Sequence, residues 1–138
     1  MSRTLVEHVS QQFRAEPRAA SAARRVVEGL EPELGRERCR AACLLVTELV
    51  ANAVQHGSGG PADTVTVRVC KSHRGLRVGV IDAGPAFEPT PRAGEGGGLP
   101  ESGWGLYLVE QMADRWGVEP GPEREVWFEL DDSSRGMS

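Results

Sequence analysis

The sequence predicts an α+β protein, a two-layer sandwich in which helices cover one face of a mixed, mostly antiparallel sheet. Residues 36–55 carry apolar side chains at helical period, the pattern of an amphipathic helix. Residues 65–69 and 76–80 alternate apolar and polar side chains, as strands with one buried face do. A chain of 138 residues is long enough for one core, so we expect a single domain over residues 1–131 and a disordered tail over 132–138.

The N-terminal part predicts a strand, a helix and a loop. Leu5 to Ala15 reads as the first strand. Pro17 then opens a helix over Arg18 to Glu28, and Gly29 closes it, because proline suits a helix start and glycine a helix end. Leu30 to Gly35 is expected to be a loop.

The helix from Arg36 to Gln55 has the strongest pattern in the chain. One wide stripe at helical period holds its apolar residues: Ala42, Leu45, Val46, Leu49, Val50, Ala53 and Val54. The glycine-rich stretch Gly57 to Pro61 ends it. The short connection Lys71 to Gly75 predicts that the two strands beside it form an antiparallel hairpin.

A long loop separates the hairpin from the last elements. Ala83 to Gly103 is rich in Gly and Pro, and a loop of roughly twenty residues in a compact domain is commonly a functional lid or a disordered segment. A third helix is expected over Trp104 to Arg115, and a final strand over Val126 to Leu130.

Composition excludes several classes of protein. The net charge of −4 argues against a nucleic-acid partner, because neutralising phosphates requires clustered Lys and Arg. No apolar run reaches the roughly 20 residues of a membrane span, and the N-terminus lacks a signal-peptide pattern, so a cytoplasmic location is expected. The three cysteines, Cys39, Cys43 and Cys70, are interpreted as small buried hydrophobes rather than as a disulfide framework or a zinc site.

Polar residues interrupt two of these elements. Glu48 and Asn52, four residues apart, lie opposite the apolar stripe of their helix, where a solvated face is the simplest interpretation. Asp82 continues the parity of Leu76, Val78 and Val80 and therefore points to the buried face, where a carboxylate needs a partner. It is interpreted either as a turn residue that binds its own backbone or as a group that recognises an exocyclic amine.

Two glycines precede the third helix. Gly103 and Gly105 place free backbone N–H groups at a helix start, which suits a phosphate, although a plain glycine hinge gives the same pattern. The spacing matches neither the Walker nor the dinucleotide fingerprint.

The order of these motifs resembles a known family. ELVANAVQHG looks like the N box, DAGPAF like the first glycine box and GWGLYLV like the second glycine box of the GHKL ATPase superfamily, which includes gyrase, histidine kinases and MutL. The resemblance extends from about Leu5 to Leu130 and is nearest to the anti-sigma factor serine kinases and related actinobacterial regulators. It implies a Bergerat-type ATP-binding fold.

The resemblance also implies ATP and Mg²⁺ as cofactors, and a role for each motif residue. Glu48 matches the general base and Asn52 the Mg²⁺ ligand, with His56 and Gly57 at the end of the N box. Asp82 matches the residue that binds the adenine amino group. The other expected nucleotide contacts are Gly84, Gly103, Gly105 and Leu106, with Pro85 to Ser102 as the ATP lid.

The implied function is a protein serine kinase with protein partners. Such a protein phosphorylates a serine of a STAS-type anti-anti-sigma protein and sequesters a sigma factor, and it often forms a homodimer. Arg24 matches a partner-contacting arginine, and an ordinary solvated charge is the alternative interpretation.

Two departures from the family pattern favour a second functional hypothesis, with weak or no nucleotide binding. Ala86 stands where the first glycine box carries a glycine, and Glu123-Arg124-Glu125 replaces a pair with a threonine hydroxyl that helps to hold adenine. The second hypothesis is therefore a non-catalytic or weakly nucleotide-binding protein-binding module of the same fold. A histidine kinase catalytic domain is a third and weaker interpretation.

Overall fold

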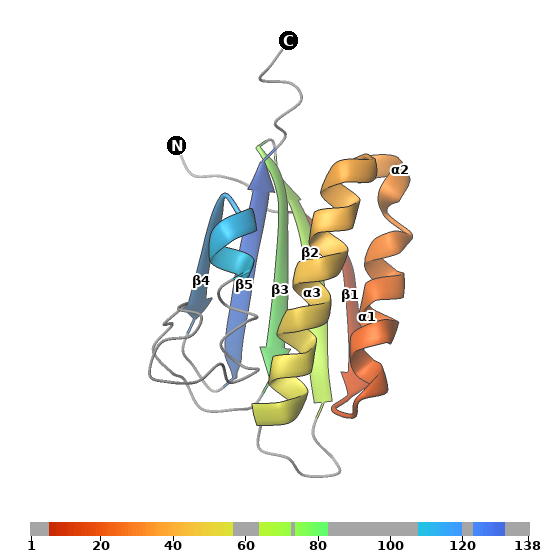
Figure 1. The fold of residues 1–138 in the computed structure, drawn as a ribbon, viewed down its shortest axis with the longest axis vertical. Helices are drawn as coiled ribbons and strands as arrows, with labels where there is room; N and C mark the ends of the chain where they lie inside the picture. Colours follow the sequence, from red (N-terminus) through yellow and green to blue (C-terminus); the bar gives the residue numbers. More distant parts are fainter. Residues whose placement is uncertain (1–5, 57–63, 73, 83–107, 120–122, 132–138) are drawn as a thin grey trace.

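The computed structural model describes residues 6–56, 64–72, 74–82, 108–119 and 123–131, and in this part of the chain it has the predicted two layers (Figure 1). The strands form one five-stranded sheet in the order β1-β2-β3-β5-β4. Their bounds are β1 (Val6–Arg14), β2 (Thr64–Ser72), β3 (Gly75–Asp82), β4 (Arg115–Glu119) and β5 (Arg124–Asp131). Each neighbouring pair is antiparallel, so the described sheet is antiparallel throughout rather than mixed.

The helices lie together on one face of the sheet (Figure 1). They are α1 (Arg18–Glu28), α2 (Glu31–Leu34), α3 (Arg36–His56) and a short helix over residues 108–112. In the described ranges, no helix has both the length and the hydropathy to cross a bilayer.

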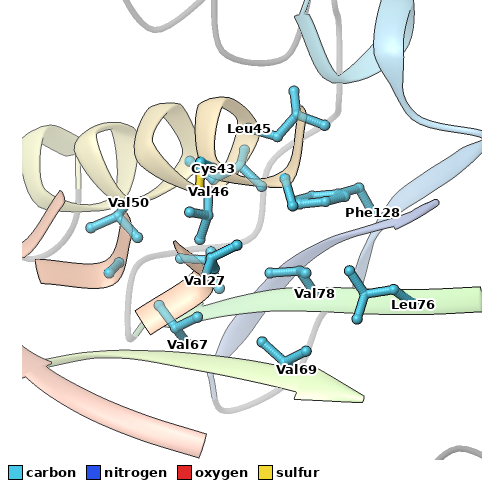
Figure 2. Close-up of a cluster of buried hydrophobic side chains, with 14 of the residues drawn as sticks. Val27, Cys43, Leu45, Val46, Val50, Val67, Val69, Leu76, Val78 and Phe128 are labelled. Carbon is cyan, nitrogen blue, oxygen red and sulfur yellow. The ribbon is translucent and has the colours of Figure 1, made fainter. Parts of the chain in front are cut away.

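Helix α3 forms the centre of the core. Leu45, Val46 and Val50 are fully buried in a cluster with side chains of the sheet and with Val27 of α1 (Figure 2). Leu45 points toward Phe128 of β5, whose ring is fully buried as well. The stripe expected from the helical period is therefore the surface with which α3 covers the sheet.

The predicted first strand, first helix, main helix, hairpin and final strand are all present, and two expectations are wrong. The segment Leu30 to Gly35 is not simply a loop, because Glu31–Leu34 forms one helical turn. Acidic residues at the start of that turn favour it electrostatically, and Leu34 is buried. Gly35 ends the turn with φ 87°, a left-handed conformation that glycine adopts without strain.

The third helix also ends earlier than expected, and a strand was missed. In the described residues the helix ends at 112, and β4 begins at Arg115. Trp116 and Val118 of β4 pack against the core, whereas Arg115 turns to the other face of the sheet and contacts Glu129. This alternation is the period-2 signal of a strand, but it spans too few residues to compete with the preceding helical pattern.

The cysteines on α3 are buried, as predicted, whereas Cys70 of β2 is only partly buried. The Sγ atoms of Cys39 and Cys43 are 4.0 Å apart, and each faces a backbone carbonyl oxygen of α1, that of Val27 for Cys39 and that of Arg24 for Cys43. Burial raises the pKa of both thiols, and that of Cys43 reaches about 12. Both residues therefore act as small packing groups between the two helices.

Burial of α3 predicts a contrast between two adjacent leucines. Leu45→Ala should lower the free energy of unfolding by about 2–5 kcal/mol, because Leu45 is 0% exposed and its loss leaves a cavity. Leu44→Ala, at a side chain that is 42% exposed, should change it by about 0.5 kcal/mol or less. Urea unfolding of the two variants measures both values, and equal losses would contradict the described orientation of α3.

The raised thiol pKa values predict slow alkylation. At pH 8, iodoacetamide should modify Cys43 of the folded protein on the order of a thousandfold more slowly than an unperturbed thiol, because so little thiolate is present. The rate should rise about tenfold for each pH unit between 7 and 10, since this range lies below the pKa. Peptide mass spectrometry follows each site, with the urea-unfolded chain as control. Equal labelling of folded and unfolded protein would refute the burial of Cys43.

Candidate functional site

Three predicted site residues lie toward the same end of the molecule. Helix α3 and strand β3 both finish at the lower end in Figure 1, and β5 starts there. Asp82 is the last residue of β3, and Glu48 and Asn52 lie in the C-terminal half of α3. The side chains of Glu48 and Asn52 therefore lie toward the same end of the molecule as Asp82.

The orientation of α3 shows which strand these side chains face. Asn52 follows Leu45 by seven residues, nearly two full turns, so it points in almost the same direction as Leu45, toward β5. The expectation that Asn52 lies opposite the apolar stripe is therefore wrong, because Leu45 belongs to that stripe. It lies about 10 Å beyond Leu45 along the helix, while Arg124 lies about 13 Å before Phe128 along β5. Asn52 therefore faces the start of β5. Glu48, one turn earlier, is half-buried like Asn52 and lies on neighbouring helix surface.

A buried ion pair occupies the end of the sheet. Nη2 of Arg124 lies 3.0 Å from both carboxylate oxygens of Asp82. The two residues are directly opposite each other in the antiparallel register of β3 and β5. Asp82 is 4% exposed and Arg124 is 5% exposed. Charge-assisted hydrogen bonds of this kind are stronger than neutral ones, so the pair holds both side chains in place.

The sequence indicated that Asp82 needs a partner, but Arg124 was missed as that partner. Its signal was present in the parity of β5, because Arg124 precedes Val126 and Phe128 by two and four residues and therefore shares their buried face. The pairing itself depends on the register of β3 with β5, two strands separated by the long loop and β4, and no local pattern encodes that register.

Among the described residues, Glu48 and Asn52 have the chemistry to hold magnesium and phosphates, whereas Asp82 is not arranged to hold a base. A carboxylate and an amide oxygen from Glu48 and Asn52 are suitable groups beside a hard cation and phosphates. The Asp82 carboxylate, expected to accept a hydrogen bond from the adenine amino group, instead accepts from Arg124 with both oxygens. The carboxylate that was expected to hold the base is therefore engaged by the protein itself.

Arg24 lies apart from this site. It forms an exposed ion pair with Glu28, with Nε 3.1 Å from Oε2, on the surface of α1. It also borders a surface hollow of about 980 Å³ over α1, α2 and α3, which contains the exposed side chains of Leu44 and Met112. Glu48, Asn52 and Asp82 do not line this hollow.

The remaining predicted contacts lie outside the described residues. These are Gly57, Gly84, Gly103, Gly105 and Leu106, together with the proposed lid from Pro85 to Ser102. His56 ends α3, as the N-box pattern implied.

The antiparallel sheet and its one-sided helical cover are those of a GHKL-type ATPase fold. The chain belongs to the histidine kinase-like ATPase domain family, whose sequence model matches residues 13–129. The superfamily to which the motifs pointed is thereby confirmed.

Two known proteins are similar to the chain. The uncharacterized protein SCO4941 of Streptomyces coelicolor is 38% identical over 81 residues, which cover 59% of this chain and 75% of that protein. The crystal structure of the RsbU and RsbW domains of Rv1364c from Mycobacterium tuberculosis has a similar fold, with a TM-score of 0.64 and 18% identity over 90% of this chain. The chain spans 32% of the length of that structure, so the likeness concerns the fold of one part of it.

The buried pair predicts strong energetic coupling between β3 and β5. Asp82→Ala and Arg124→Ala should each destabilise the fold by about 3–5 kcal/mol, because each breaks a buried ion pair. The double variant should cost clearly less than the sum of the two. Urea unfolding measures this cycle.

The same cycle on the exposed pair of Arg24 and Glu28 serves as the control, with coupling of about 0.5 kcal/mol or less. Additive losses at Asp82 and Arg124 would contradict a direct interaction between them.

Proposed function

We propose that the chain is an ATP-binding regulatory domain of the anti-sigma serine kinase type. It would bind Mg-ATP, phosphorylate a serine of a STAS-type anti-anti-sigma protein and sequester a sigma factor. The observation that carries the proposal is the placement of Glu48 and Asn52. Both are half-buried on α3, where Asn52 faces the start of β5 and Glu48 lies one turn earlier, in a chain that matches the histidine kinase-like ATPase family from residue 13 to 129.

The proposed chemistry divides between the two side chains. Mg-ATP, when bound, supplies the phosphoryl group. Glu48 would accept the proton of the attacking serine hydroxyl, and the amide oxygen of Asn52 is of the type that ligates Mg²⁺. Because such a site acts by positioning and charge stabilisation, an i, i+4 pair on one rigid helix is a suitable frame for it. The glycines at 84, 103 and 105 and Leu106 would complete the nucleotide contacts.

Arg24 is proposed as a contact for the sigma factor. It stands on the rim of the hollow over the helical layer, where the exposed Leu44 and Met112 offer apolar surface to a protein partner. Phosphorylation of the antagonist would then decide which protein is held, provided that its two forms differ in affinity. A homodimer is proposed for the active state.

A second candidate function is a protein-binding module that binds nucleotide weakly and transfers no phosphate. The ion pair between Asp82 and Arg124 favours it, because the group expected to hold adenine is already engaged. Ala86, in place of a glycine of the first glycine box, also favours weak nucleotide binding.

A phosphotransfer assay separates the two functions. The purified chain, incubated with labelled Mg-ATP and STAS-domain proteins, should transfer phosphate to serine. Glu48→Ala should reduce the rate by about 10²–10⁴-fold, the usual contribution of a general base, while nucleotide binding is retained. Glu37→Ala, an exposed acid on the same helix, should leave the rate unchanged.

Calorimetric titration accompanies the assay. Undetectable nucleotide binding at millimolar ATP, together with no transfer by the parent chain, would refute the kinase and leave the binding module. Retained transfer in Glu48→Ala would refute the role of Glu48 alone.

A further inference from the structure

The interaction between Asp82 and Arg124 has a consequence for nucleotide choice. Both side chains lie on the helix-covered face of the sheet, opposite each other across β3 and β5, and neither is more than 5% exposed. This is the same end of the sheet toward which Asn52 points. The guanidinium is therefore part of the base end of the candidate site rather than of the outer surface.

Arg124 and an adenine amino group would compete for the same acceptor. The exocyclic amine of adenine is a hydrogen-bond donor, and Asp82 would recognise it only as an acceptor. Arg124 is also a donor, carries a full positive charge and already reaches both carboxylate oxygens at 3.0 Å. Exchanging a bond between two charged groups for one in which only the acceptor is charged is unfavourable, and it would break the buried ion pair.

The open face of the same sheet shows that an arginine in this region need not face inward. Arg68 of β2 lies on that face and pairs with Glu125 of β5, with Nη2 3.1 Å from both carboxylate oxygens. Arg124 and Glu125 are consecutive and point to opposite faces, so the inward arginine is specific to position 124. A threonine at 124 would fit the same strand and would remove the guanidinium that now donates to the Asp82 carboxylate.

We propose that Arg124 determines the base specificity of this chain by acting as an internal competitor of adenine for Asp82. The inference rests on the proposed nucleotide-binding function and refines it. The unmodified chain binds nucleotide mainly through its triphosphate and magnesium and therefore distinguishes poorly between adenine and guanine. Removal of the guanidinium restores a preference for adenine.

Calorimetric titration with Mg-ATP and Mg-GTP tests the proposal in the parent chain, Arg124→Thr and Arg124→Gln. The parent chain should bind the two nucleotides within about threefold of each other, and Arg124→Thr should bind ATP about tenfold more tightly with GTP almost unchanged. The ratio of the two Kd values is the decisive measure, because a general change in stability would move both nucleotides together. Arg68→Thr, which removes the same charge on the open face, should leave the ratio as in the parent.

Circular dichroism first establishes that each variant is folded, and Arg124→Gln replaces Arg124→Thr if the latter is not. A measurement on the parent chain needs no variant. The NMR signals of the Arg124 guanidinium should shift little when GTP or ATP binds, because the pair with Asp82 stays closed.

A parent chain that strongly prefers ATP, with the ratio unchanged in Arg124→Thr, would overturn the role of Arg124 and leave the nucleotide-binding function intact. Absence of all nucleotide binding, in the parent and in every folded variant, would overturn both. Tighter ATP binding in Arg124→Thr that is lost again when Asp82→Asn is added would support the competition directly.

Discussion

The packing of α3 across the sheet is the constraint from which the site follows. Leu45, Val46 and Val50 fix the rotation of the helix about its axis, since they are fully buried in the common core. With the rotation fixed, the side chains two turns beyond Leu45 have no freedom to face another way. Asn52 is thus positioned toward β5, with Glu48 one turn earlier, by apolar contacts of the same helix.

Much of the fold was predictable, because it is encoded by periodicities local to each element. The helical stripe of α3, the alternation of β2 and β3 and the proline and glycine around α1 each require only neighbouring residues. Helix α2 and strand β4 were missed for a common reason. Each is about one turn or a few residues long, and Trp116 and Val118 acquire their strand geometry from pairing with β5.

The candidate site was predictable in its members and not in their pairing. Sequence parity placed Asp82 on the buried face and showed that it needs a partner, and parity alone would have placed Arg124 there too. What no local pattern contains is the register that sets Asp82 directly opposite Arg124. A family resemblance assigned the Asp82 carboxylate to a ligand, whereas the fold assigns it to a residue of the neighbouring strand.

The two assignments differ in what the Asp82 carboxylate contributes to the stability of the fold. If Asp82 is held for a nucleotide, its burial is a cost that ligand binding offsets, and the fold alone should tolerate its loss. Because Arg124 satisfies it within the protein, the carboxylate joins β3 to β5 whether or not a nucleotide is present. A pocket whose polar end is satisfied in this way no longer depends on its ligand for structural integrity. Such a domain could lose adenine recognition in small steps while it keeps the surface of α1 and α3 that we propose contacts protein partners.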